Sequence, residues 1–318
     1  MKIIGKWKII DILKNNNGHI IYYVSPIIDK NTTKQEFDDL VDIKWIMKYS
    51  IQDYSNEINI INEMKLYENE LCIRMPISEK YRYEINHEEK YSWYITERYE
   101  NSIYNSPKFC KNNLKLLGHY MINFFEWLHL EKQKIHGDIK PENIVVNSSK
   151  KIKNTYQNYF KVIDYDTVDF PDFDVTCENS SFNGYYYYHL GCNSNESYLS
   201  FKMDLQAFGM ILLNLCISNE KYNLLEWQCK ASQLYKDKYS VNQTNQYKYL
   251  NVIRKSSFIN VLSFIENEEH KQLISKYFSI IHKQGWSKIP NPNVYIELKK
   301  LFKLPEKNSK INIRRKSI

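Results

Sequence analysis

One stretch, residues 136–146, constrains this chain more than any other. It reads His-Gly-Asp-Ile-Lys-Pro-Glu-Asn-Ile-Val-Val. An amphipathic helix is predicted before it, over 111–131, and a β-branched strand follows at 144–147. Gly, Asp, Pro and Asn also occur in ordinary surface turns because turns favour them. Eleven residues in this order, between a helix and an apolar strand, instead indicate a built site.

The residue types of this stretch suit phosphoryl transfer to a hydroxyl group. Asp138 and Asn143 stand five positions apart, which is the spacing in the kinase pattern H-R-D-L-x-x-x-N. A carboxylate at 138 would orient the hydroxyl and accept its proton. The side-chain oxygen of Asn143 would bind magnesium. Lys140, between them, would place a cation on the transferring phosphoryl group.

His136-Gly-Asp-Ile-Lys140, with glycine where most protein kinases have arginine, resembles the vaccinia-related kinases. This family belongs to the casein-kinase-1 group of the protein kinase superfamily and has poxvirus members. The resemblance implies a bilobal α+β protein-kinase fold with ATP and Mg²⁺ as cofactors. It implies one kinase domain over 1–304, with a small β-rich N-lobe (1–100) and a larger helical C-lobe (101–304).

Two further segments extend the resemblance into the C-terminal half. The predicted strand 159–163 ends at Asp164-Tyr165-Asp166, in the place of D-F-G. The resemblance makes Asp164 the second magnesium ligand, beside Asn143. Asp204, in the apolar run that begins at Met203, matches the aspartate that supports the catalytic loop from a buried helix.

The segment that should cover the ATP phosphates departs from the family. Strands are predicted over 7–13 and 20–24. The glycine positions between them hold Lys14, Asn16 and His19, and only Gly18 remains, out of register. We assign Gly18 to phosphate binding and expect ATP to bind weakly. Residues 25–39 are polar and are predicted to be a loop.

Val41-Asp42-Ile43-Lys44 matches the family strand V-A-I-K at three of four positions. The sequence therefore predicts that Lys44 meets the α- and β-phosphates, although a solvated strand lysine is the alternative. Glu57, in a helix predicted over 52–68, would hold that lysine, with Glu63 as a rival partner. Residues 91–99 resemble the last N-lobe strand and the hinge. Thr96 would be the gatekeeper there, and the backbone of Glu97 and Tyr99 would bind adenine.

The sequence supports two principal functions. The first is a serine/threonine protein kinase of weak activity, because the chain retains every charged group that the chemistry needs. The second is a pseudokinase, a binding or competitor protein without catalysis. Asp42, Asp166, Tyr185 and Cys192, each at a position where the family has another residue, favour the second. In an inactive protein, mutation should not have left these charged groups unchanged, so we favour the first function.

Composition adds little to these alternatives. The net charge is +7, and the tail 305–318 is basic and predicted to be disordered. A third reading, a nucleic-acid-binding module, rests only on those two features. The six cysteines show no C-x-x-C spacing, and the N-terminus has no signal-peptide pattern. We expect a soluble intracellular monomer, cytoplasmic with access to the nucleus, that does not contact membranes. Family substrates include small chromatin-associated DNA-binding proteins, which makes a protein of that kind the expected partner.

Overall fold

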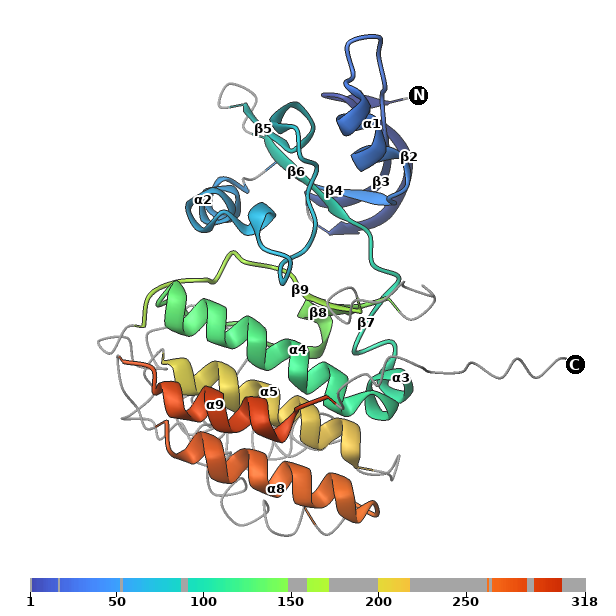
Figure 1. Cartoon of the computed structure of the whole chain (residues 1–318). Helices are drawn as coiled ribbons and strands as arrows, with labels where there is room; N and C mark the ends of the chain where they lie inside the picture. Colours follow the sequence, from blue (N-terminus) through green and yellow to red (C-terminus); the bar gives the residue numbers. More distant parts are fainter. Residues whose placement is uncertain are drawn as a thin grey trace, which may run out of the picture.

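The computed structural model describes residues 2–16, 18–51, 54–86, 91–147, 159–171, 200–217, 262, 265–284 and 289–304. Two parts follow one another along the chain. A curled sheet with two helices occupies the first hundred residues, and a helical part occupies the remainder (Figure 1). No helix in these ranges is both long enough and apolar enough to cross a membrane.

The N-terminal sheet has six strands in the order β1-β2-β3-β4-β6-β5, all antiparallel to their neighbours. Its strands are β1 (Ile3–Ile4), β2 (Trp7–Asn16), β3 (His19–Pro26), β4 (Trp45–Ser50), β5 (Tyr83–Asn86) and β6 (Tyr91–Glu97). Aromatic and β-branched residues form the strands and supply the core under the sheet. Trp7, Trp45 and Trp93 are almost entirely buried in that core. The predicted strands 7–13, 20–24 and 91–99 are therefore confirmed, with β2 extending further than expected.

The prediction of a loop over 25–39 is wrong in its second half, where α1 (Lys34–Val41) forms. A capping box starts this helix. The side chain of Thr33 accepts a hydrogen bond from the Glu36 backbone N–H, and the Glu36 carboxylate accepts one from the Thr33 N–H. The predicted strand 41–44 is likewise wrong, because Val41 ends α1 and β4 begins only at Trp45.

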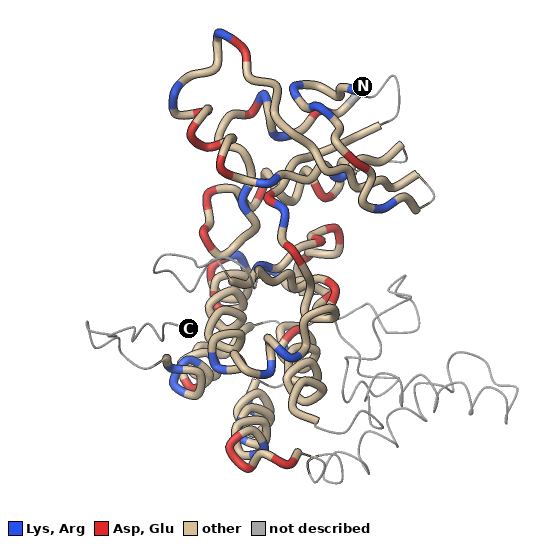
Figure 2. Tube along the Cα trace, turned by 90° about the vertical axis from the view of Figure 1, so that its right-hand side faces the viewer, with Lys and Arg blue, Asp and Glu red and all other residues tan. Residues whose placement is uncertain are grey.

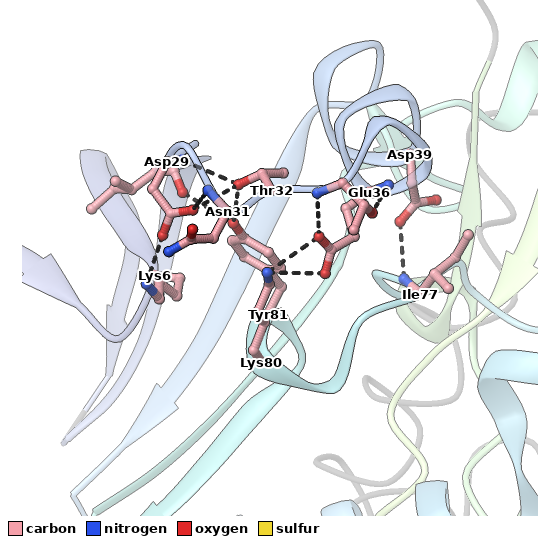
Figure 3. A network of polar contacts seen from close by, with 11 residues as sticks. Lys6, Asp29, Asn31, Thr32, Glu36, Asp39, Ile77, Lys80 and Tyr81 are labelled. Atoms are coloured by element: carbon pink, nitrogen blue, oxygen red, sulfur yellow. Dashed lines mark hydrogen bonds and ion pairs between the residues drawn. The ribbon is translucent and has the colours of Figure 1, made fainter.

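Polar contacts fasten this long β3–β4 connection to the segment 74–82 (Figure 3). Lys80 pairs with Glu36 at 3.0 Å, and the Ile77 backbone N–H donates to Asp39 at 2.9 Å. The N–H of Thr33 is the largest of the causes that lower the pKa of Glu36 to about 2. Both contacts hold α1 itself, through Glu36 and Asp39, so the helix is fixed against this segment.

Two further groups of elements complete the fold. Beside the sheet lie α2 (Ser55–Met64) and the short 3₁₀ helices η1 (Leu66–Glu68) and η2 (Glu79–Tyr81). The C-terminal part contains β7 (Asn101–Ser102), α3 (Pro107–Asn112), α4 (Leu114–Glu126), the π-helical turn η3 (Trp127–Glu131), the 3₁₀ helix η4 (Pro141–Asn143), β8 (Ile144–Val146), β9 (Phe160–Val162), α5 (Phe201–Cys216), α8 (Glu268–His282) and α9 (Pro292–Leu301). The helix predicted over 111–131 is present as α4 and η3.

The helices α4, α5, α8 and α9 pack together beneath the small sheet β7-β8-β9, which lies between them and the N-terminal sheet (Figure 1). Phe125 and Phe208 meet edge to face between α4 and α5, at 5.9 Å between ring centroids. Charges of both signs alternate along both parts of the described chain (Figure 2).

Candidate functional site

The loop 136–143 is held from below by one buried carboxylate. Asp204, on α5, accepts hydrogen bonds from the backbone N–H of His136 at 2.6 Å and of Gly137 at 3.0 Å. Gly137 has φ +77°, a conformation that costs a side-chain-bearing residue free energy. The glycine thus fits the shape that Asp204 imposes on the loop. The expectation that Asp204 supports this loop matches the geometry.

Asp138 presents its two carboxylate oxygens differently. Oδ2 accepts from Lys140 Nζ at 2.8 Å and from Asn143 Nδ2 at 2.7 Å. Oδ1 is buried and has no hydrogen-bond partner within the described residues. Burial is the largest cause that raises the pKa of Asp138 to about 7, against the opposing effect of Lys140. A buried acceptor without a partner is costly, and this oxygen retains the capacity to accept a hydrogen bond from a ligand or a water molecule.

Asn143 links the loop to the strands that follow it. Its Nδ2 also donates to the backbone carbonyl of Asp138 at 3.1 Å, so its side-chain oxygen is the atom left to face a cation. The backbone carbonyl of Asn143 accepts from the Ile163 N–H at 2.9 Å. This bond brings the end of β9, and with it Asp164, beside the loop.

The lysine that pairs with Glu57 is Lys48, so the predicted pairing of Glu57 with Lys44 is wrong. Lys48 Nζ lies 3.3 Å from Glu57 Oε1 and 3.0 Å from Asp164 Oδ1. Lys44 precedes β4 and is exposed, and its carbonyl accepts from the Arg98 N–H. Asp42 is also exposed, at the end of α1. Both residues lie outside the strand that carries the functional lysine.

Glu57 does occupy the predicted place, although its partner is Lys48. Its carboxylate is almost fully buried and also accepts from the Tyr165 backbone N–H at 3.1 Å. Burial opposes the charge of Lys48, but Glu57 and other neighbours raise the pKa of the Lys48 ammonium well above its usual value. The rival Glu63 pairs instead with Lys134 at 3.0 Å. These contacts decide between the two glutamates.

Asp164 and its neighbours lie beside this ion pair at the end of β9. The charge of Lys48 is the main cause that lowers the pKa of Asp164 to about 2, so this carboxylate is ionised. Asp164 has φ +72°, which Asp tolerates better than most residues. Tyr165 packs its ring 5.6 Å from that of His136, centroid to centroid. Burial, followed by the charge of Asp164, raises the pKa of Asp166. The substitution at 166 thus places a second carboxyl group close to the first.

The donor atoms at this site fit magnesium. Within the described residues no group of three His, Cys, Asp or Glu side chains could hold a metal by itself. Asp164 and Asn143 offer one carboxylate and one amide oxygen. Mg²⁺ is usually bound by one or two carboxylates together with substrate phosphates and water. The pair therefore suits a metal that arrives with a nucleotide.

The β2–β3 hairpin closes in a tight turn at Gly18. This glycine has φ +91°, and its carbonyl accepts from the Ile51 N–H at 3.2 Å. His19 lies against Tyr54, at 5.5 Å between ring centroids. The hairpin tip therefore rests on the segment between β4 and α2. That Gly18 binds phosphate stays a prediction.

Two other predictions concern the connection after β6. The Glu97 backbone N–H donates to the Arg74 carbonyl at 2.8 Å, so this N–H is not directed at a ligand. Burial raises the pKa of the Tyr99 phenol. Adenine binding by the backbone of Glu97 and Tyr99 stays a prediction. Tyr185, Cys192, the segment 224–227 and the tail 305–318 lie outside the described residues.

A groove of ≈ 870 Å³ lies away from this site, between residues 64–71 and the exposed side of α4. Glu70, Leu116, Tyr120 and Lys132 are among its lining residues. It contains none of the residues discussed above. The chemistry-bearing side chains instead meet at the junction of the N-terminal sheet and the catalytic loop.

Comparisons with solved structures place this geometry in a known architecture. Vaccinia related kinase 3 superposes with a TM-score of 0.57 over 93% of this chain and 86% of its own, at 14% identity. The kinase PK-1 of Cydia pomonella granulovirus gives a TM-score of 0.53 over 93% of both chains, also at 14% identity. The chain has the bilobal α+β fold of the protein kinases.

Sequence comparison supports a narrower conclusion than the comparison of structures. No protein-family model matches the chain. The serine/threonine-protein kinase PKH2 of Saccharomyces cerevisiae is 33% identical over 97 residues. That stretch is 30% of this chain and 9% of the yeast protein. The match supports a relation to protein kinases, while membership of the vaccinia-related family is not shown.

Lys48 is the site residue that sequence reasoning missed. It ends the segment Trp45-Ile46-Met47-Lys48 of β4. Its tryptophan and methionine are fully buried on the sheet's core side, which leaves the lysine facing the other way. Strand alternation alone could not separate Lys44 from Lys48, because four residues along a strand return to the same face.

Proposed function

We propose that this protein is a serine/threonine protein kinase that transfers the γ-phosphate of ATP to a protein hydroxyl, with weak activity. The buried, unpartnered Oδ1 of Asp138 carries the proposal. A hydroxyl placed against this oxygen would satisfy it and would find a base at the same time. The fold and the match to a yeast serine/threonine kinase support the same conclusion.

In the reaction, the substrate oxygen attacks the γ-phosphorus while the bond from that phosphorus to the β,γ-bridging oxygen breaks. The hydroxyl proton passes to Asp138, and ADP leaves with the electron pair of the broken bond. Lys140, held 2.8 Å from Asp138, stabilises the negative charge on the transferring group. Asp164 and Asn143 would hold Mg²⁺, which neutralises the phosphates when bound. Lys48 binds the α- and β-phosphates, and Glu57 fixes its position.

We also propose that the chain is a divergent member of the vaccinia-related kinase family, supported by His-Gly-Asp-Ile-Lys and by Tyr165 after Asp164. The substrate proposed on that basis is a chromatin-associated protein. With glycine at 137, the loop lacks the arginine before Asp138 that would bind a phosphate on the activation segment. Activity should therefore not require phosphorylation there.

The runner-up is a pseudokinase. The specific observation in its favour is the hairpin tip, where the family glycines are replaced and Gly18 rests against Ile51. Such a protein would keep the fold and bind partners without transferring phosphate. The two functions differ first in nucleotide binding and then in turnover.

A thermal melt tests the nucleotide site directly. Millimolar MgATP should raise the melting temperature, because a ligand that binds only the native state stabilises it by mass action. The rise should need magnesium and disappear in Asp164→Asn. Asparagine suits φ +72° about as well as aspartate, so the variant should fold. An unchanged melting temperature with MgATP would contradict the kinase proposal.

The pKa of Asp138 predicts how turnover depends on pH. Asp138 must be unprotonated to accept the hydroxyl proton, and its pKa is about 7. We expect kcat to fall about tenfold per pH unit below that value and to level off above it.

The free energy of unfolding depends on the protonation of Asp138 in the opposite direction. A raised carboxyl pKa favours the protonated folded state, so its stabilisation is lost as pH rises through 7. Acid unfolding linked to Asp138 therefore cannot cause the fall, and a flat rate from pH 6 to 8 would contradict the role of base.

A further inference from the structure

A buried chain of hydrogen bonds joins the last helix of the described fold to the catalytic loop. On α9, the Tyr295 hydroxyl lies 2.7 Å from His129 Nδ1. On the other side of the same ring, His129 Nε2 lies 3.0 Å from Asp204 Oδ2. Asp204 in turn holds the backbone N–H groups of His136 and Gly137. The carboxylate of Asp204 on α5 thus contacts His129 of η3 directly and Tyr295 of α9 through His129, and it also shapes the loop of Asp138.

The three side chains that form these hydrogen bonds are buried away from water. Tyr295 and His129 have no exposed surface, and Asp204 is 1% exposed. The His129 ring stacks on Phe125 at 5.2 Å and lies 5.1 Å from Phe201, centroid to centroid. The ring cannot turn without disturbing this packing. The hydrogen bonds at its two nitrogens therefore decide where its proton resides.

The donor and acceptor of each hydrogen bond at the His129 ring follow from the ionised state of Asp204. Its carboxylate already accepts two backbone N–H groups, and although burial opposes ionisation, the bond from His129 and its other neighbours lower its pKa. An ionised carboxylate only accepts. His129 must therefore donate from Nε2, which leaves Nδ1 as an acceptor in the neutral ring. Tyr295 then donates its hydroxyl hydrogen to Nδ1.

We propose that Tyr295 is a positioning residue for catalysis. Its hydroxyl donates to Nδ1 and so reinforces the Nε2–H tautomer of His129 that the Asp204 carboxylate requires, which keeps the imidazole donating to Asp204. Without that hydroxyl, Nδ1 is left as a buried acceptor with no donor, so the Nε2–H tautomer and its bond to Asp204 are favoured less strongly. The loop, with Asp138, would lose part of its support. This inference rests on the proposed kinase function for its kinetic consequence and on the geometry alone for the tautomer.

The chain offers a matched control in Tyr277. This tyrosine on α8 is also fully buried, and it donates to the backbone carbonyl of Leu205 on α5 at 2.7 Å. Its hydroxyl is thus bonded to the same helix as Asp204, without passing through His129. Tyr277→Phe and Tyr295→Phe each remove one buried hydroxyl and leave the ring. A purely structural role predicts that both variants behave alike.

The experiment compares the two variants in the full chain. Both should lower the melting temperature by similar amounts. Only Tyr295→Phe should lower kcat, by about three- to tenfold, with the KM for ATP unchanged, because Tyr295 acts on the loop and not on the nucleotide. Equal kcat values for the two variants would overturn the proposal.

A second experiment, which records the NMR signals of the histidine ring nitrogens, tests the inference even if the wild type shows no turnover. In protein labelled with ¹⁵N in the histidine rings, His129 should show a protonated Nε2 and an unprotonated, hydrogen-bonded Nδ1. Absence of the signal in His129→Gln assigns it among the eight histidines of the chain. Tyr295→Phe should shift both ring nitrogens, whereas Tyr277→Phe should not. Unchanged ring signals in Tyr295→Phe would overturn the inference even if the protein proves to be an active kinase.

Discussion

Lys48→Met should reduce ATP-dependent phosphate transfer at least about 100-fold, the scale expected when one charge-stabilising group is removed from a reacting phosphate. Lys44→Met is the matched control and should leave the rate near that of the wild type, since Lys44 is exposed and lies before β4. The measurement is the initial rate of phosphate transfer to a general protein substrate or to the protein itself.

Folding must be separated from chemistry in that comparison. Removing Lys48 alone leaves the carboxylate of Glu57 buried without its cation, which costs about 3–5 kcal/mol when a buried pair loses one partner. The double variant Lys48→Met/Glu57→Gln removes both charges and should recover much of the stability but none of the activity. If Lys44→Met were the inactive variant, the assignment made from the ion pairs would be wrong.

Asp138→Asn should lower kcat by about 10²- to 10⁴-fold, the usual contribution of a positioned general base. The asparagine amide has nearly the same shape. Its oxygen can still accept from Lys140 and Asn143, and its nitrogen takes the place of Oδ1. The MgATP-induced rise in melting temperature should therefore persist while turnover disappears.

Glu142→Gln supplies the control for charge. Glu142 lies in the same loop, is exposed, and loses the same single charge in the variant. Its rate should stay within about twofold of the wild type, because an exposed charge is screened by solvent. Retention of wild-type turnover by Asp138→Asn would exclude Asp138 as the base and leave the pseudokinase reading as the better account of any biological function.

The sequence was informative where short-range chemistry dictates both residue type and spacing. The loop 136–146 is of this kind, since Asp138, Lys140 and Asn143 contact one another directly across two to five positions. The long helices were also predictable, because their apolar faces repeat with helical period. In both cases the information is local.

The errors arose where distant packing decides the outcome. Lys44 and Lys48 share a strand face in any alternating pattern, and only the burial of Trp45 and Met47 beneath the sheet shows which of them lies within β4. Glu57 and Glu63 stand six residues apart, which puts them on faces about 120° apart around a helix, but the local pattern does not show which of these faces meets the lysine. Their partners, Lys48 and Lys134, are separated from each other by more than eighty residues of sequence.

The helix α1 is a different kind of error, because its signal is local. Thr33-Lys-Gln-Glu36 has the S/T-x-x-E spacing of a capping box, and Phe37, Leu40 and Val41 follow at helical intervals. The polar composition of 25–39 and the match of 41–44 to a strand motif outweighed it. A family motif with one mismatch was weaker evidence than a capping signal with its helix.

The support of the catalytic loop also bears on how far such a chain can diverge. Asp204 grips the backbone amides of residues 136 and 137, and Tyr120 likewise accepts from the backbone N–H of Val162 and donates to the carbonyl of Leu71. A main-chain atom is present whatever side chain mutation installs. Each anchor therefore constrains its own residue and makes no demand on the side chain at the position that it holds, except where the backbone needs a positive φ, as at Gly137. Main-chain anchors of this kind can persist while the side chains that they hold change, which suits a fold that the chain shares with its structural neighbours at 14% identity.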